Sequence, residues 1–324
     1  MTSPDATPLV VIVTPVYNGA RYLAETMQAV QSQDYDNLLH IVLDNASTDE
    51  TPAILARFEG ARVPVKTARN KITLPLVDNW NTMLGLIPPE ARYFRMLCAD
   101  DLIAPSYIRK TVRVAEDNPQ AGLVGCLFHY SGGDVADPCW PSDREVFAGR
   151  EAIRAYLRGE CWMPSLHVLF RCTDLAARKP FFRKMLATDL AAVLDILLQH
   201  DLGFVHEDLS MTRLHDATIS STALQRDRRH LCEWFFFLRE YGPSTLGADT
   251  AHDLILLYRR YYLRQLIRWR FNGKGNLYAV QMRELRAIAE TPGFLEYVDA
   301  LWDWVMMRAG LRPVWSGYPF NDAG

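Results

Sequence analysis

The sequence predicts an α/β protein in which a doubly wound, mainly parallel sheet is followed by a C-terminal helical region. Apolar runs alternate with helical patterns, which is typical of a parallel sheet with helices on both faces. The runs at residues 9–14 and 38–43 lack polar alternation, as do strands that are buried on both faces. After Thr222 the strand patterns cease and only helical patterns follow.

Strand patterns are separated by helical ones along most of the chain. The predicted strands are residues 9–14, 38–43, 63–66, 93–97, 122–128, 165–171 and 203–207. The predicted helices are residues 22–30, 50–58, 80–86, 105–116 and 189–200, then 225–241, 249–271, 276–290 and 293–309. This change of pattern places a domain boundary near Ser221, between an α/β domain (1–221) and a helical region (222–324).

The composition excludes several classes of protein. The chain has 324 residues, of which 49% are hydrophobic and 23% charged, so it is long enough and apolar enough to be globular. The net charge of -3 provides no basic field for nucleic acid. The six cysteines lack CxxC spacing, and no signal peptide or span of ~20 apolar residues is seen. We therefore expect a cytoplasmic protein, with contact to the inner face of a membrane left open.

Polar clusters end three of the predicted strands. Tyr17 follows the first strand, Asp44 ends the second, and Asp100 and Asp101 follow the apolar end of the fourth. The C-terminal ends of parallel strands share one sheet edge, where ligands bind in open α/β sheets. Two carboxylates there suit a hard divalent cation. Each cluster also has a simpler interpretation, because Asp is a preferred helix N-cap and an aromatic residue can anchor a turn.

The motifs at residues 11–18 (VIVTPVYN), 41–49 (IVLDNASTD) and 97–101 (LCADD) resemble those of family 2 glycosyltransferases with a GT-A fold. The resemblance covers roughly residues 9–220 and matches in order and spacing. It implies transfer of a sugar from a nucleoside-diphosphate sugar, aided by Mg²⁺ or Mn²⁺. The acceptor, whether a glycan, a lipid-linked glycan or a small molecule, is left open.

The resemblance also implies roles for individual residues. Donor binding is assigned to Pro15, Tyr17, Asn18, Asp44, Asn45, Arg69, Asn70, Asn79, Ala99, Asp100 and Arg213. Metal binding is assigned to Asp100, Asp101 and His215. The chain departs from the family's Asp-x-Asp motif because Cys98 holds its first position, and a thiol is a poor ligand for a hard cation. Arg69, Asn70 and Asn79 could equally lie in solvated loops.

Catalysis is assigned by the same resemblance to Asp189, as the base that deprotonates the acceptor in an inverting reaction. Asp195 is the competing carboxylate, and a helix dipole alone could explain an acid at the position of Asp189. Trp162 is placed on the acceptor side, where it could stack on a sugar, although core packing explains it equally well.

The C-terminal helices lie outside the resemblance. Arg260, Arg264 and Arg268 share one helix face, which indicates either a membrane-facing basic surface or pairing with nearby acids. The apolar segment 234–237 should pack on the sheet domain or form a homodimer interface.

The preferred hypothesis is thus a metal-dependent glycosyltransferase. The alternative is a non-catalytic protein of the same fold that binds nucleotide sugar or acts as a scaffold, which Cys98 keeps open. A dinucleotide-dependent oxidoreductase is disfavoured, since no GxGxxG follows any predicted strand.

Overall fold

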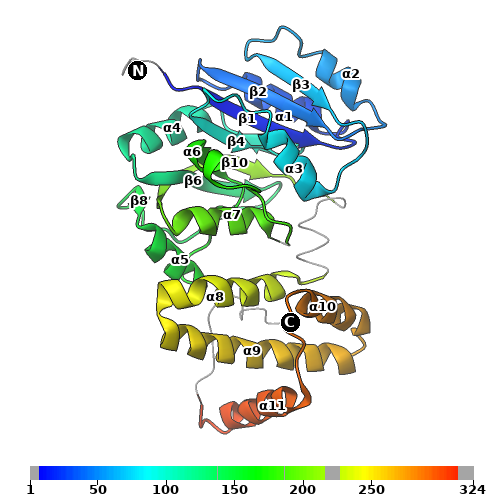
Figure 1. Ribbon diagram of the computed structural model, residues 1–324, viewed down its shortest axis with the longest axis vertical. Helices are drawn as coiled ribbons and strands as arrows, with labels where there is room; N and C mark the ends of the chain where they lie inside the picture. Colours follow the sequence, from blue (N-terminus) through cyan, green and yellow to red (C-terminus); the bar gives the residue numbers. More distant parts are fainter. Residues whose placement is uncertain (1–6, 137, 186, 216–226, 313–324) are drawn as a thin grey trace. The chain divides into compact units, whose positions relative to one another are not determined.

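A computed structural model of the chain describes residues 7–136, 138–185, 187–215 and 227–312 (Figure 1). By its internal contacts the chain divides into two compact units. The first comprises Met1–Ala152 and Met163–Arg213, and the second comprises Ile153–Trp162 and Leu214–Gly324. The predicted boundary at Ser221 lies outside the described residues.

The first unit is built on a single mixed sheet. Its strands are β1 (Val10–Val16), β2 (Leu38–Asp44), β3 (Val65–Arg69), β4 (Tyr93–Met96), β5 (Leu102–Ile103), β6 (Ala121–Tyr130), β7 (Val135–Ala136), β8 (Val146–Phe147), β9 (Val168–Arg171) and β10 (Asp201–Thr212). The main strand order is β3-β2-β1-β4-β9-β6-β10-β5. The first four strands in this order run parallel, and β9 runs antiparallel to both β4 and β6.

Helices separate these strands along the chain. They are α1 (Leu23–Gln31), α2 (Thr51–Ala56), α3 (Leu76–Leu84), α4 (Tyr107–Asp117), α6 (Thr173–Ala177) and α7 (Thr188–Leu197). A further helix, α5 (Gly149–Leu157), crosses the division between the units. The α/β class predicted from the alternation of strand and helix patterns is therefore confirmed.

The central strands have apolar side chains on both faces. Val10 and Ile12 of β1 join a core cluster that includes Tyr107 and Ile108 of α4. Val11 and Val13, which alternate with them, are also fully buried. Burial on both faces explains why the sequence of β1 reads as a continuous apolar run. It also leaves the ends of the strands as the places where polar groups gather.

The second unit is helical. Its main helices are α8 (His230–Leu246), α9 (Ala248–Phe271), α10 (Gly275–Ala287) and α11 (Phe294–Arg308). Trp234, Phe235 and Phe237 of α8 are buried within the unit, where the Trp234 ring centroid lies 4.7 Å from that of Tyr156. None of the helices in the described part of the chain is both long and apolar enough to cross a membrane.

Candidate functional site

The polar clusters converge because of the register of the parallel strands. Val16 at the end of β1 pairs with Asp44 at the end of β2, and Asp44 pairs with Arg69 at the end of β3. Val13 pairs with Met96, so the segment after β4 emerges at the same sheet edge. Pro15 lies within β1, and Tyr17 follows it with 52% of its surface exposed. Local sequence thus ends each strand in polar residues, and strand pairing brings those ends together.

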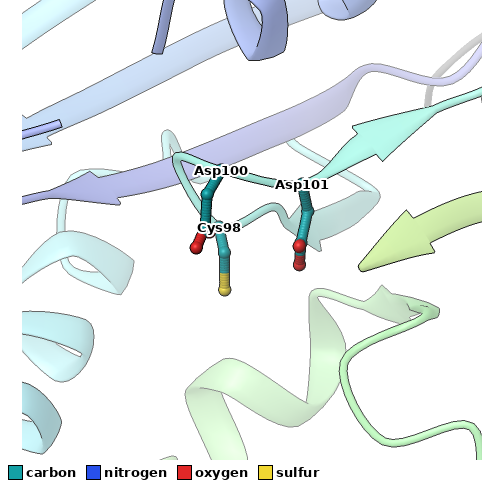
Figure 2. A group of neighbouring side chains, drawn as sticks. All are labelled: Cys98, Asp100 and Asp101. Atoms are coloured by element: carbon teal, nitrogen blue, oxygen red, sulfur yellow. The ribbon is translucent and has the colours of Figure 1, made fainter. Parts of the chain in front are cut away.

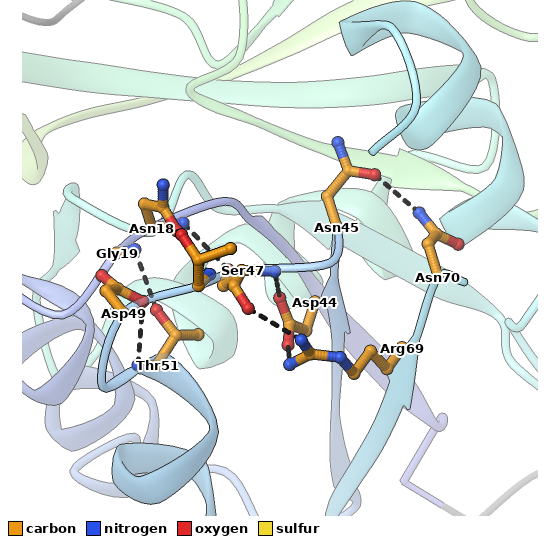
Figure 3. A network of polar contacts seen from close by, with 10 residues as sticks. Asn18, Gly19, Asp44, Asn45, Ser47, Asp49, Thr51, Arg69 and Asn70 are labelled. Atoms are coloured by element: carbon orange, nitrogen blue, oxygen red, sulfur yellow. Dashed lines mark hydrogen bonds and ion pairs between the residues drawn. The ribbon is translucent and has the colours of Figure 1, made fainter. Parts of the chain in front are cut away.

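The loops after β1 and β2 are joined by hydrogen bonds (Figure 3). The Asn18 amide donates to Ser47 Oγ over 2.9 Å, and the Thr48 amide donates to Asn18 Oδ1 over 2.8 Å. The Gly19 amide donates to Thr51 Oγ1 over 2.9 Å. Asn18 has a φ of 49°, a left-handed conformation that Asn tolerates better than most residues. These bonds fix the loop from which Tyr17 projects.

Asp44 is held inside this network and is only 2% exposed. Its carboxylate accepts a hydrogen bond from the Ser47 amide over 2.8 Å and forms an ion pair with Arg69. The Arg69 guanidinium also donates to the Ser47 carbonyl oxygen over 2.7 Å (Figure 3). Two residues assigned to donor binding therefore contact each other. A carboxylate has about four acceptor positions, so Asp44 keeps capacity for a further donor.

A second network, made of amides, orders the loop after β3. Asn45 Oδ1 accepts hydrogen bonds from Asn70 Nδ2 over 2.8 Å and from the Leu74 amide over 2.9 Å (Figure 3). Asn70 Nδ2 also donates to Asn79 Oδ1 over 2.8 Å. Asn79 is buried, so it does not lie in a solvated loop, which was one of the two interpretations of its sequence position. Asn70 thus links Asn45 to Asn79, and the three side-chain amides order the loop at this edge of the sheet.

The segment after β4 places Cys98, Asp100 and Asp101 side by side (Figure 2). One possible metal-ligating atom from each residue lies within 4.8 Å of the others. The Thr26 hydroxyl lies 3.0 Å from the Ala99 carbonyl oxygen and 2.9 Å from that of Asp101, which fixes the turn against α1. The turn therefore points two carboxylates and a thiol in one direction.

Arg213, just beyond β10, closes this turn from the other side. Its amide donates to Asp101 Oδ1 over 3.0 Å, and its Nε donates to the Asp100 carbonyl oxygen over 3.1 Å. Its guanidinium also pairs with Glu25 over 2.6 Å. Arg213 is the first residue after β10, which ends at Thr212. Arg213 is thus brought to the predicted metal motif.

The electrostatics of the turn distinguish its side chains. Burial, with a further contribution from the Asp100 carboxylate, raises the pKa of Asp101 to about 7. Burial, followed by the charges of Asp101 and Asp100, raises the pKa of the Cys98 thiol well above its usual value. The thiol therefore stays protonated at neutral pH and is a poor ligand for a hard cation. The carboxylates remain as the oxygen donors that such a cation prefers.

Asp189 lies in the first turn of α7, where the helix dipole favours a negative charge. It accepts a hydrogen bond from the Ser165 hydroxyl. The charge of Asp189 also contributes to the raised pKa of Cys98, which places it within electrostatic range of the predicted metal motif. The competing carboxylate, Asp195, forms ion pairs with Arg178 and with Arg183, the latter over 3.4 Å. The geometry therefore favours Asp189 as the available carboxylate.

Two predicted site residues fall in the second unit. His215 follows Arg213 in the chain but belongs to that unit, and it is not a member of the Cys98, Asp100 and Asp101 group. Trp162 also belongs to the second unit and is 42% exposed.

Thr26, Ser165 and Tyr130 also lie near the site, although no role was assigned to them from the sequence. The Tyr130 phenol has a raised pKa because of burial and the charge of Asp101, which places it near the same turn. Nothing in the local sequence around these residues distinguishes them from ordinary surface or core positions.

The chain is similar in sequence to known glycosyltransferases. A model of glycosyl transferase family 2 matches residues 11–181. An uncharacterized glycosyltransferase of Haemophilus influenzae is 32% identical over 118 residues, which span 36% of each chain. A second one, from Rickettsia typhi, is 25% identical over 241 residues, which span 72% of each chain.

Two solved structures share the fold. S. aureus TarS 1-349 in complex with UDP-GlcNAc superposes with a TM-score of 0.62 at 14% identity, covering 92% of this chain and 81% of that one. The mannosyltransferase PcManGT from Pyrobaculum calidifontis, in complex with GDP-Man and Mn²⁺, has a TM-score of 0.58 at 17% identity. Its match covers 95% of this chain and 84% of that one.

Proposed function

Because the chain belongs to glycosyl transferase family 2 and has the GT-A fold, we propose that it transfers a sugar from a nucleoside-diphosphate sugar to an acceptor hydroxyl. The observation that carries the proposal is the convergence of Tyr17, Asp44, Asp100 and Asp101 on one sheet edge. Solved neighbours of the same fold hold UDP-GlcNAc or GDP-Man, which supports a donor of this class.

The residues after β4 suit a divalent cation. The Asp100 and Asp101 carboxylates are near neighbours, and burial of Asp101 makes its negative charge costly without a cation. We assign these carboxylates to Mg²⁺ or Mn²⁺ and leave the Cys98 thiol out of the ligand set, because a soft thiol is a poor ligand for a hard cation. A bound cation would neutralise charge on the departing diphosphate. Mn²⁺ in the PcManGT complex supports this assignment.

Asp189 is proposed as the general base. Its carboxylate would take the proton of the acceptor hydroxyl, whose oxygen then forms a bond to the anomeric carbon. The bond between that carbon and the diphosphate oxygen breaks, and a single displacement of this kind inverts the configuration. Ser165 holds the carboxylate through its hydroxyl, and the ion pairs of Asp195 leave it less suited to this role.

Tyr17 is proposed to contact the nucleobase, because its exposed ring stands at the edge where Asp44 is fixed. Arg69 is half exposed although it pairs with Asp44, so its guanidinium can be approached by a phosphate. Asn18, Asn45, Asn70 and Asn79 are proposed to shape the donor pocket through the networks that they form.

A second candidate is a non-catalytic protein that binds nucleotide sugar. Cys98 supports this alternative, because the first position of the metal motif lacks a carboxylate. The two candidates differ in whether metal-dependent donor turnover occurs.

Calorimetric titration with UDP, GDP, dTDP and CDP, each with and without Mn²⁺, tests the proposal. We expect one nucleotide to bind tightly only with the metal, and Asp100→Ala to abolish that dependence. The same variant should abolish metal-dependent hydrolysis of the matching sugar donor. Nucleotide binding that is unchanged in Asp100→Ala, without donor turnover by either protein, would favour the non-catalytic candidate. A folded protein that binds none of the four would contradict both.

A further inference from the structure

Helix α11 presents large apolar side chains to the outside of the second unit. The exposed fractions reach 80% for Phe294, 78% for Leu295 and 58% for Trp302. The α11 apolar stripe is defined here as Phe294, Leu295, Val298, Leu301, Trp302 and Val305. Spacings of three and four residues place these side chains on one helix face. An ordinary surface helix turns such a face inward, so the orientation of α11 needs an explanation.

The opposite face of α11 is fixed by ion pairs to α9. Asp299 pairs with Arg260 over 2.6 Å, and Asp303 pairs with Arg264 over 2.7 Å. Glu296 pairs with Arg259. Asp303 is buried, so its pairing with Arg264 is shielded from solvent. This polar seam between α9 and α11 keeps the apolar stripe facing outward.

The stripe is large enough for a stable interface. Its exposed surface is on the order of 650 Å² if an aromatic side chain offers roughly 150–250 Å² and an aliphatic one somewhat less. A standard protein–protein interface buries roughly 600–1,000 Å² on each partner, whereas the largest apolar patch of a typical monomer is roughly 300–600 Å². Two such stripes facing each other would therefore form an interface of standard size.

The chemistry of α11 favours a second copy of the chain over a lipid surface. Membrane-surface helices carry Lys and Arg on their polar face, but Glu296, Asp299 and Asp303 occupy that face of α11. The stripe itself is uncharged, so two copies can meet without like-charge repulsion. At its border, Arg308 lies 5.2 Å from the Trp304 ring centroid, and Trp and Arg are both enriched in interfaces.

We propose that the α11 apolar stripe is the two-fold interface of a homodimer, in which α11 packs against α11 of the second copy. Such an interface is isologous, so each stripe residue contacts the same stripe of the other copy. This inference rests on the second unit and is independent of the proposed transferase reaction.

The test is the mass of the full chain in solution, measured by light scattering during size-exclusion chromatography. We expect about twice the 37.0 kDa chain mass. Leu301→Glu should reduce it to one chain mass, because each stripe then carries a buried negative charge facing apolar side chains. Leu86→Glu is the matched control, since Leu86 is a similarly exposed leucine outside the stripe, and it should remain dimeric. Circular dichroism should show that both variants are folded.

Several outcomes would overturn the inference. One is a monomeric wild-type chain, and another is a dimer that Leu301→Glu leaves intact. A monomer that co-sediments with phosphatidylcholine–phosphatidylglycerol vesicles, and loses this property in Leu301→Glu, would show that lipid covers the stripe. A third is a full chain that is monomeric together with a variant truncated after Arg312 that is dimeric. This result would show that residues 313–324 compete with a second copy for the stripe.

Discussion

At the scale of single residues, the motif residues contact one another before any ligand is considered. The Asp44 carboxylate is occupied by the Ser47 amide and by Arg69, and Asn45 is bonded to Asn70 and Leu74. These contacts pre-organise the proposed donor site, so ligand binding would not have to order it. The polar edge itself could be predicted, because each strand ends in polar residues. The pairing of Asp44 with Arg69 could not, because it depends on the register of β2 and β3.

Asp189 gives the most direct test of the proposed chemistry. Asp189→Asn keeps the size of the side chain and its contact with Ser165 but cannot accept the acceptor proton. We expect kcat to fall roughly 10²–10⁴-fold, the usual contribution of a general base, while donor KM changes little. Asp195→Asn is the control and should cost stability more than kcat, because Asp195 pairs with Arg178 and Arg183. Equal losses of kcat in the two variants would contradict the assignment of Asp189 as the general base.

Ser165 was not predicted, and its role depends on contacts that lie far apart in sequence. It has a φ of 46°, a left-handed conformation that is costly for a residue with a side chain. Its hydroxyl reaches Asp189, which lies 24 positions further along the chain. Backbone strain that persists beside a candidate base indicates that the position of Ser165 matters for function.

Two substitutions separate the hydroxyl of Ser165 from its backbone. Ser165→Gly removes both the hydroxyl and the strain, whereas Ser165→Ala removes the hydroxyl alone. We expect both to lower kcat, by about the factor of ten that one hydrogen bond of roughly 1.4 kcal/mol represents, with Ser165→Gly the more stable of the two. Steady-state kinetics and thermal melting measure the two effects. Unchanged kcat in both variants would mean that the hydroxyl does not position Asp189.

At the scale of elements, the helices predicted from the sequence agree best with the structure where the apolar pattern is long and periodic. The four C-terminal helical patterns correspond to α8–α11, because each is long and periodic. Helix α5 was missed, and its first residue shows why. A Cβ on Gly149 would lie 2.2 Å from the Leu197 carbonyl oxygen, so glycine is needed there for close packing. In a sequence, glycine at such a position indicates a loop.

The pairing of α9 with α11 explains the arginine face that the sequence left open. Arg260 and Arg264 pair with acids of α11. Of the two interpretations, pairing with nearby acids therefore applies to these two arginines, and a membrane-facing basic surface does not. Asp303 is the buried member, and Arg260, Arg264 and Arg312 all approach it. Its removal would leave these cations without their shared partner.

Asp303→Asn should therefore destabilise the second unit by about 3–5 kcal/mol, the usual cost of breaking a buried pair. Asp299→Asn removes a half-exposed partner of Arg260 and should cost about 1 kcal/mol or less. Urea unfolding monitored by helical circular dichroism measures both. Similar midpoints for the two variants would contradict the importance of burial in this ion-pair network.

At the scale of the whole molecule, the proposed functions divide between the two units. The first unit matches the family model over most of its length and carries the strand edge with the residues proposed to bind the donor and the metal. The second is helical, and the inference drawn from it concerns assembly. From the sequence, His215 was assigned to the metal and Trp162 to the acceptor side. Their membership of the second unit depends on long-range packing. Single-sequence patterns carry no information on such packing.

The stability of the first unit should depend on pH through His40, which is fully buried on β2. Its Nε2 is 2.9 Å from Thr14 Oγ1, and burial lowers its pKa to about 3. In the unfolded chain the imidazole has its ordinary pKa of about 6.5. The folded state therefore resists protonation, and its stability is retained above pH 6.5 and lost as the pH falls towards 3.

The expected loss is about 1.4 kcal/mol per pH unit below 6.5, which is the linkage slope for one proton. His40→Gln keeps a polar group near Thr14 but cannot become charged, so this variant should lack that part of the slope. Urea unfolding of both proteins at a series of pH values isolates the effect, because all other titrating groups are common to the pair. Parallel curves for the two proteins between pH 6.5 and 4 would show that His40 is protonated equally in the folded and unfolded states. The neutral, buried histidine would then not account for the acid sensitivity of the sheet.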